Sequence, residues 1–261
     1  MMHEFFALTD TGRTRENNED SLTFDVENGL GILADGMGGY NAGEVASGMA
    51  TAFIASELGR WLSSAGTQAQ TKEVRRAMEV CVENVNRSIY NSANTNPQYH
   101  GMGTTLVVGV FWKDQLILGH IGDSRCYRWR GGALAQITRD HSLLQEQLDA
   151  GLITPEQAAG SFNRNLVTRA LGVEHTVMLE VNEHNVEAGD IYLMCSDGLT
   201  DMVSDATIAT VFSGNSTLAA IATRLVDSAN ASGGRDNISV LLINASQRAK
   251  RRGLMARLLG K

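Results

Sequence analysis

Aspartate residues recur in four short segments of this chain, each beside glycine, serine or asparagine. The segments are Asp35-Gly36-Met37-Gly38-Gly39, Gly122-Asp123-Ser124-Arg125, Ser196-Asp197-Gly198 and Arg235-Asp236-Asn237. Three of them follow an apolar stretch typical of a strand, and the fourth precedes one. A carboxylate at a strand end can point into a shared cleft, and several such carboxylates form a hard-oxygen site for Mg²⁺ or Mn²⁺. The pattern therefore indicates a divalent-metal site assembled from distant parts of the chain.

An arginine and two further acids stand near the N-terminus, in the segment that contains Arg15, Glu19 and Asp20. A guanidinium group presents a planar fork of donors that matches the oxygens of a phosphate. Taken singly, each feature has a plain explanation, because an Asp-Gly pair usually marks a turn and a lone arginine usually lies at the surface. The arginine combined with four aspartate segments favours phosphate chemistry at a metal site.

The composition narrows the class of protein. The chain has 261 residues, 43% of them hydrophobic, which is enough for a large core within one domain. With 29 acids against 22 bases, the net charge of −7 argues against a nucleic-acid-binding surface as the main function. Cys81, Cys126 and Cys195 form no paired motif, the first residues lack the pattern of a signal peptide, and no run reaches the roughly 18 apolar residues of a membrane span. We therefore expect a cytoplasmic protein with no nucleic-acid partner.

The hydrophobic periodicity predicts an α+β protein. Residues 42–62 and 74–89 have apolar positions at helical spacing, and 205–212 and 218–229 read as shorter helices. Strands are predicted at 5–9, 21–26, 30–34, 104–112, 116–121, 126–130, 182–193 and 238–243. Long amphipathic helices beside antiparallel strands favour a layered sandwich.

The order of these segments along the chain resembles that of a known family. The arginine-acid segment, Arg15-x-x-Asn18-Glu19-Asp20, precedes the four aspartate segments. The motifs between them are Gly43-Glu44, Gly103-Thr104-Thr105 and Asp140-His141-Ser142. In this order they resemble the metal-dependent serine/threonine protein phosphatases of the type 2C class, in particular the bacterial branch, from about residue 5 to about residue 244. The resemblance implies a four-layer α/β/β/α sandwich with two central antiparallel β-sheets flanked by helices.

The resemblance also implies a reaction and its cofactors. Phosphoserine and phosphothreonine in proteins would be hydrolysed by direct attack of a water or hydroxide that bridges two Mn²⁺ or Mg²⁺ ions. Bacterial relatives imply a third, weaker ion, and no organic cofactor is expected. The expected partners are phosphorylated proteins and a bacterial serine/threonine kinase that the enzyme opposes.

Roles for the metal ligands follow by position from the same resemblance. Asp35 would bridge the two core ions and the nucleophilic water, and the carbonyl of Gly36 would bind one of these ions. Asp197 and Asp236 would complete the coordination of the other ion. Asp123, together with Asp197, would bind the third ion.

Three further residues take their roles from the resemblance as well. Glu19 and Asp20 would hold metal-bound waters, which orients the coordination without direct ligation. Arg15 would bind the substrate phosphate through its planar fork.

One position departs from the eukaryotic members of the family. Those members carry a histidine two residues after the bridging aspartate, proposed as the acid that protonates the leaving group. Met37 stands at this position, as in the bacterial branch, and a thioether donates no proton. The leaving-group acid is therefore either a metal-bound water or another residue, and His141 is a candidate by residue type alone.

The resemblance divides the chain into a catalytic domain and a tail. The catalytic domain is expected at residues 1–246, with a flap insert at about 142–171 that is tied to substrate choice. Residues 247–261 form a C-terminal tail that is rich in lysine and arginine and contains the apolar residues Leu254, Met255, Leu258 and Leu259. Two interpretations of the tail stay open: a solubilising terminus, or a weak contact with an anionic membrane or a partner.

Three functions are compatible with these residues. The first is an active protein serine/threonine phosphatase, which the motif set favours. The second is a metal-dependent phosphoesterase that acts on a small molecule, since a fold and its site do not name the substrate. The third is a phosphoprotein-binding regulator without activity, which is disfavoured because every acid expected from the family is present.

Overall fold

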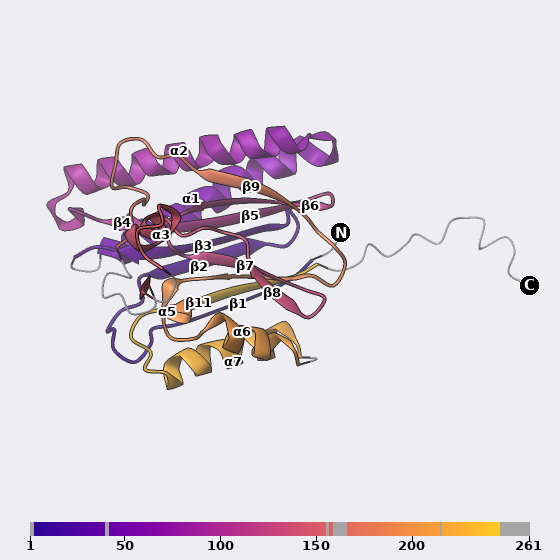
Figure 1. Cartoon of the computed structure of the whole chain (residues 1–261). Helices are drawn as coiled ribbons and strands as arrows, with labels where there is room; N and C mark the ends of the chain where they lie inside the picture. The colour runs from indigo at the N-terminus through magenta and orange to yellow at the C-terminus, as the bar shows by residue number, and fades with distance from the viewer. Residues whose placement is uncertain (1–2, 40–41, 155–156, 159–165, 215, 246–261) are drawn as a thin grey trace, which may run out of the picture.

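Two antiparallel β-sheets face each other and are covered by helices on both outer sides (Figure 1). The structure, a computed structural model, describes residues 3–39, 42–154, 157–158, 166–214 and 216–245. The order of the layers, helices, sheet, sheet and helices, confirms the α+β four-layer sandwich expected from the sequence.

The first sheet has six strands in the order β2-β3-β5-β6-β9, and the short β4 pairs with β3. Its strands are β2 Asp20–Asp25, β3 Leu30–Met37, β4 Gly103–Thr104, β5 Leu106–Trp112, β6 Gln115–Ile121 and β9 Glu180–Asn185. The hairpin of β2 and β3 sets Asp20 opposite Asp35 in an antiparallel register. Two predicted site residues therefore lie side by side at one end of this sheet.

The second sheet has five strands in the order β1-β11-β10-β7-β8. Its strands are β1 Glu4–Asp10, β7 Arg125–Arg130, β8 Ala133–Gln136, β10 Ile191–Cys195 and β11 Ile238–Asn244. The register of β1 and β11 runs from Glu4 opposite Asn244 to Asp10 opposite Ile238. The first and last described strands are therefore neighbours.

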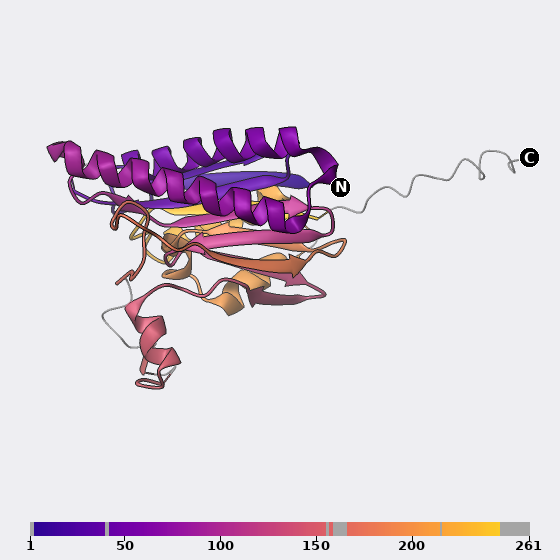
Figure 2. The ribbon, with the colours of Figure 1, turned by 90° about the horizontal axis from the view of Figure 1, so that it is seen from above.

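Two pairs of helices form the outer layers. The helices are α1 Ala42–Ala65, α2 Thr71–Thr95, α3 Leu143–Asp149, α5 Asp197–Thr200, α6 Asp205–Phe212 and α7 Leu218–Ala231, with single 3₁₀ turns at Gly66–Gln68 and Pro97–Tyr99. The long α1 and α2 pack on the six-stranded sheet, and α6 and α7 pack on the five-stranded sheet. Seen from above, α3 stands away from the sandwich (Figure 2).

Successive side chains along a strand enter the two different cores that cover the faces of each sheet. In β3, Leu30 and Ile32 join the core under α1 and α2, while Leu33 points into the core between the sheets. In β11, Leu242 packs under α7 and Leu241 packs between the sheets. Side chains on a strand alternate between faces, so a strand buried on both sides reads as a continuous apolar run.

One predicted strand, residues 182–193, is wrong as a single element. The chain forms β9 in one sheet, turns, and then forms β10 in the other sheet. The turn is closed by the amide of Asp190, which donates to the carbonyl of Glu187 at 3.1 Å, and Gly189 adopts φ 91°. A positive φ suits glycine, and here it lets the chain cross from one sheet to the other.

The loops at one end of the sandwich carry the predicted site. The labels β4, α3 and α5 lie at this end, away from the N-terminus (Figure 1). Within the described part of the chain, no helix is long and apolar enough to cross a membrane.

Candidate metal and phosphate site

A cavity of about 300 Å³ opens at the end where the aspartate segments meet. Its lining residues are Arg15, Glu19, Asp35, Gly36, Met37, Gly38, Thr105, Asp123, Val167, Asp197 and Asp236. The structure thus brings together residues from both sheets and from both ends of the described chain. Of the predicted site residues, Asp20 is the one that does not line the cavity, although it lies opposite Asp35 in the sheet register.

Two threonines fix the main chain that carries Asp35. The Asp35 amide donates to Thr105 Oγ1 at 3.0 Å, and the Asp35 carbonyl accepts from Thr104 Oγ1 at 2.8 Å and from the Thr105 amide at 2.9 Å. Both threonine side chains are buried. Buried hydrogen bonds of this kind hold a strand end in one place, so the backbone from which the Asp35 side chain projects is fixed.

Gly36 is required by a close approach of three segments. A Cβ atom built on Gly36 would lie 2.2 Å from the Gly43 carbonyl oxygen and 2.5 Å from the Glu19 carbonyl oxygen. The Gly36 amide donates to the Glu19 carbonyl at 3.1 Å. The glycine therefore lets the start of α1 and the Glu19 segment touch β3, which brings Glu19 beside Asp35.

The carboxylates of this site repel one another in a setting that is poorly solvated. Burial raises the pKa of Asp35 and of Asp197 well above the usual range, and neighbouring aspartates raise both further. Burial also raises the pKa of Asp20 and of Asp123 to about 6. Desolvation and like charge both disfavour the ionised form of a carboxyl group. A positive charge inside the cluster would relieve both effects.

The donor atoms of the cluster suit a hard divalent cation. All of the clustered side chains offer carboxylate oxygens, which are the ligands that Mg²⁺ and Mn²⁺ prefer. Asp20 Oδ2 accepts from Ser196 Oγ at 2.8 Å, whereas Asp20 Oδ1 is buried with no hydrogen-bond partner among the described residues. An orphaned buried oxygen beside Asp35 is an observation that fits a bound ion or its waters. The residues present therefore fit the metals that the sequence predicts.

Arg15 stands at the rim of the same cavity. Its Nη2 donates to Asp236 Oδ2 at 2.8 Å, and its side chain is 53% exposed. The hydrogen bond to Asp236 raises the pKa of Arg15, so the guanidinium is charged at every working pH. Among the described residues the other N–H donors of the fork have no hydrogen-bond partner, so they can meet an anion that enters the cavity.

Asn237 belongs to the Arg235-Asp236-Asn237 segment, but the sequence alone predicted no role for it. Its Oδ1 accepts from the Glu19 amide at 2.8 Å, and its Nδ2 donates to the carbonyls of Thr11 and Asn17 at 3.0 and 2.9 Å. Asn237 is 5% exposed. One amide side chain thus fastens the loop that carries Arg15 to the segment that carries Asp236. Only the Asp-Asn pair before a strand signalled it in the sequence.

Met37, which replaces the histidine of the eukaryotic members, and His141, the candidate leaving-group acid, occupy different places. Met37 lines the cavity, as its position beside Asp35 predicts. His141 is not among the lining residues, it is 7% exposed, and both of its ring nitrogens face protein partners. The geometry therefore does not place His141 where it could protonate a leaving group in the cavity.

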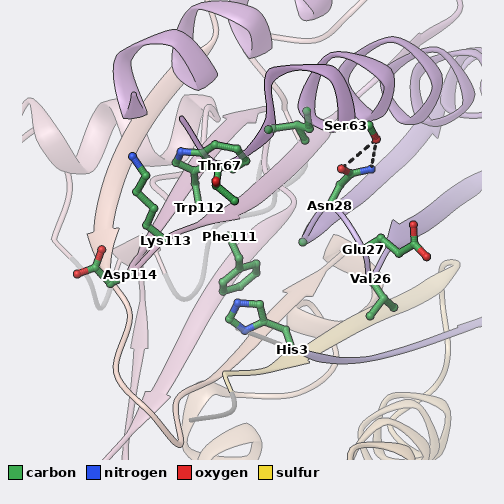
Figure 3. A pocket seen from close by; sticks show the side chains of 13 residues that line it. His3, Val26, Glu27, Asn28, Ser63, Thr67, Phe111, Trp112, Lys113 and Asp114 are labelled. Carbon is green, nitrogen blue, oxygen red and sulfur yellow. Dashed lines mark hydrogen bonds between the residues drawn. The ribbon is translucent and has the colours of Figure 1, made fainter. Parts of the chain in front are cut away.

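A larger hollow lies beside the turn between β2 and β3, at the end of β2 away from Asp20. Figure 3 shows it from close by. It measures about 780 Å³ and is lined by thirteen residues, of which Glu27, Lys113 and Asp114 carry formal charge. Lys113 Nζ donates to the Ala69 carbonyl at 3.1 Å. No cluster of carboxylates gathers in this part of the described chain, so volume alone does not mark the reactive end.

Two facing antiparallel sheets between helical layers, with buried aspartates and an arginine at one end, define a metal-dependent phosphatase. The family model for protein phosphatase 2C matches residues 11–242. The chain therefore belongs to the protein phosphatase 2C family.

Similar proteins come from several bacteria. The serine/threonine phosphatase stp of Listeria innocua is 35% identical and covers 96% of this chain and 99% of its own. The protein phosphatase PhpP of Streptococcus pneumoniae is 39% identical over 94% of this chain and 98% of its own. A crystal structure of the catalytic domain of PstP in complex with two manganese ions is 38% identical, with a TM-score of 0.82, covering 94% of this chain and 99% of that chain.

Proposed function

We propose that this protein removes phosphate from phosphoserine and phosphothreonine residues of other proteins, with two Mn²⁺ or Mg²⁺ ions as cofactors. The observation that carries the proposal is a single cavity in which Arg15 borders a cluster of partly buried aspartates. The names of the similar bacterial phosphatases and the two manganese ions of the PstP complex support the substrate and the metal.

In this proposal the chain divides the metal ligands between two core positions. Asp35 would contribute to both core ions, the carbonyl of Gly36 would hold one of them, and Asp197 and Asp236 would hold the other. Asp123 and Asp197 would hold a third ion. When bound, the ions acidify water and neutralise the negative charge of the phosphate.

The remaining residues bind and orient. Glu19 and Asp20 lie next to Asp35 and position the water around the ions. Arg15 binds the phosphate of the substrate, and its hydrogen bond to Asp236 orients the guanidinium before the substrate arrives. A preoriented donor loses little freedom on binding, which favours phosphate capture.

The cellular setting is part of the same proposal. Cys81, Cys126 and Cys195 are free and buried, as expected for a reducing compartment, and we propose a cytoplasmic location. The partner reaction is phosphorylation by a bacterial serine/threonine kinase, because an enzyme of this class needs a supply of phosphoserine and phosphothreonine. Residues 1–246 act as the catalytic unit, and residues 142–171 as the flap that selects substrates.

The basic tail, residues 247–261, lies outside the described residues. Contact of the tail with an anionic membrane stays a prediction from its composition. Co-sedimentation with anionic liposomes, comparing the full chain with a form that ends at Ser246, tests it. Equal sedimentation of the two forms removes the membrane interpretation.

The deciding experiment is phosphate release from a phosphothreonine peptide with Mn²⁺, with Mg²⁺ and with a chelator. Release that needs metal and stops with chelator supports the proposal. Turnover of phosphorylated metabolites but not of phosphopeptides would favour a small-molecule phosphoesterase. Binding of phosphopeptide by the folded protein without release would favour a regulator without activity.

A further inference from the structure

Two stacked histidines lie behind the turn that carries Asp123. His120 is the penultimate residue of β6 and His141 precedes α3. Their ring centroids are 4.7 Å apart, with the planes inclined by 14°. They are 1% and 7% exposed. Neither ring lines the cavity, so neither is explained by direct contact with substrate or metal.

The hydrogen bonds of His141 specify one tautomer. The Gly122 amide donates to His141 Nδ1 at 3.1 Å, so Nδ1 must carry a lone pair. The proton therefore sits on Nε2, which donates to Glu180 Oε2 at 3.2 Å. Burial lowers the pKa of His141, which keeps the ring neutral at neutral pH despite the nearby carboxylate.

His120, His141 and Glu180 do not make a good chelating site, although their ligand atoms lie within 4.8 Å of one another. Imidazole lone pairs lie in the ring plane, and nearly parallel stacked rings send them in parallel directions rather than to one point. His120 Nε2 also lies 2.8 Å from the Arg139 carbonyl, which it meets as a donor. The cluster is better explained by what His141 holds in place.

The main chain of His141 holds the same turn and the base of the flap. Its amide donates to the Gly122 carbonyl at 2.9 Å, and its carbonyl accepts from the Thr168 amide at 2.8 Å. Gly122 adopts φ 100°, and a Cβ there would lie 2.7 Å from Thr105 Cγ2. The turn before Asp123 is thus tightly constrained, and its amide hydrogen has its partner in the His141 ring.

We propose that His141 is a positioning residue whose neutral Nδ1 fixes the Gly122 amide, and thereby holds Asp123 at the cavity wall in register with the base of the flap. Val167, next to Thr168, lines the same cavity. The inference rests on the proposed function, in which Asp123 binds the third ion. The bond between Gly122 and His141 is a property of the folded chain, and it can be measured without activity.

Two amide substitutions distinguish the role of the Nδ1 contact from that of the Nε2 contact of His141. In His141→Asn the side-chain oxygen can stand where Nδ1 stood, and in His141→Gln the side-chain nitrogen can stand where Nε2 stood. Both replace an imidazole with a neutral amide, so each controls for general loss of the ring. Glu180→Gln keeps an acceptor for Nε2–H and serves as a further control.

The first measurement is the exchange rate of the Gly122 amide hydrogen by NMR in the metal-free protein. His141→Asn and Glu180→Gln are expected to keep it slow, and His141→Gln to raise it by about tenfold or more. The second is Mn²⁺ titration by calorimetry, in which the weakest ion is expected to bind about tenfold more weakly in His141→Gln and normally in His141→Asn.

The opposite ranking of the two variants would overturn the proposal, since it would assign the effect to the Glu180 contact. Equal Gly122 exchange in both variants would overturn it too, as would misfolding of His141→Asn alone in a thermal melt. The variant Asp123→Asn distinguishes failure of the proposed third-ion site from failure of the positioning role of His141. If it binds Mn²⁺ as the unmodified protein does, the third-ion role of Asp123 fails, while Gly122 exchange still decides the role of His141.

Discussion

Strand β2 begins at one end of the sandwich with Asp20 and finishes at the other with Asp25. The two aspartates differ in how fully their carboxylate oxygens are hydrogen-bonded. Asp25 accepts from the amides of Glu27 and Asn28 and from Asn28 Nδ2, at 2.9, 3.1 and 2.6 Å. Asp20 keeps one oxygen without a partner among the described residues, and burial raises its pKa to about 6. The carboxylate of Asp25 is satisfied by its own turn, whereas that of Asp20 keeps an oxygen that could meet a metal-bound water.

The two ends of the molecule differ in the same way. The end near Asp25 has the larger hollow, about 780 Å³, with its charges scattered (Figure 3). The end near Asp20 has a hollow of about 300 Å³ in which carboxylates crowd together. Crowded carboxylates, rather than volume, distinguish the end to which we assign the reaction, because strongly perturbed pKa values cluster at functional sites.

The largest expected effect comes from removing the shared carboxylate. Asp35→Asn is expected to lower metal-dependent phosphate release by roughly a thousandfold, because several kcal/mol of charge stabilisation depend on the ions. The variant should stay folded, and without metal it should melt no lower than the unmodified protein, since the substitution relieves repulsion. Kinetics on a phosphothreonine peptide and a thermal melt in chelator check both statements.

Asp25→Asn is the matched control at the other end of the sheet. It is expected to leave phosphate release unchanged and to lower stability by about 1 kcal/mol through its weakened turn. Equal loss of activity in the two variants would remove the distinction between the ends, and near-normal activity of Asp35→Asn would disprove the assigned site.

A smaller effect is expected at the rim. Arg15→Ala should raise KM for phosphopeptide by about tenfold with little change in kcat, because the guanidinium binds phosphate in the ground state and the transition state alike. Arg60→Ala, which loses an exposed contact with Glu57, is the control and should change neither constant. A fall in kcat at unchanged KM would contradict the binding role of Arg15.

The carboxylate cluster predicts how metal and pH act together on stability. The folded-state pKa of Asp20 and Asp123, about 6, lies above the roughly 3.9 of an unfolded chain. Between these values the folded protein binds more protons than the unfolded chain. Without metal, the contribution of these groups is therefore present below about pH 4 and lost as the pH rises through about 6.

Mn²⁺ binds the ionised carboxylates, so the stabilisation by metal should grow over the same range. At a hundredfold excess over Kd, we expect about 2.7 kcal/mol, or roughly 5–10 °C in Tm, near pH 7.5 and much less near pH 5. Thermal melts with Mn²⁺ and with chelator at both pH values measure the difference. An equal shift at both would show that the aspartates do not titrate as the structure indicates.

The smallest effect is expected at the larger hollow. Ser63 Oγ accepts from Asn28 Nδ2 at 3.0 Å (Figure 3). Its single hydroxyl hydrogen is shared between Asn28 Oδ1 at 3.1 Å and the Gly59 carbonyl at 3.0 Å. Ser63→Ala should cost about 0.5–1 kcal/mol of stability and leave kcat and KM unchanged. A measurable loss of phosphate release would mean that this end also affects the reaction.

Local patterns were enough to predict a layered α+β sandwich and the aspartate segments that meet at the cleft, whereas the count of four layers came from the family resemblance. Apolar runs such as β3 and the helical spacing of α2 depend on burial, which the sequence records directly. The aspartate segments were found because their residue types are unusual at strand ends. The resemblance to a family then supplied roles that spacing alone does not contain.

The sequence failed where the information is not local. The prediction of one strand at residues 182–193 joined the polar edge strand β9 to the apolar strand β10, and Gly189 lies in the passage from one sheet to the other. Asn237 and His141 act through bonds to residues 218 and 19 positions away, at Glu19 and Gly122. No pattern within a window of the chain reports such pairings, since they follow from the packed fold.

The pairing of β1 with β11 also determines when this site can assemble during synthesis of the chain. Arg15 and Asp236 are bonded partners 221 positions apart, and β11 lies between β1 and β10 in its sheet. A ribosome adding about 5–20 residues per second therefore makes Arg15 roughly 10–40 seconds before its partner. A nascent chain that has not yet reached Asp236 therefore lacks one wall of this cavity and cannot carry out the proposed reaction.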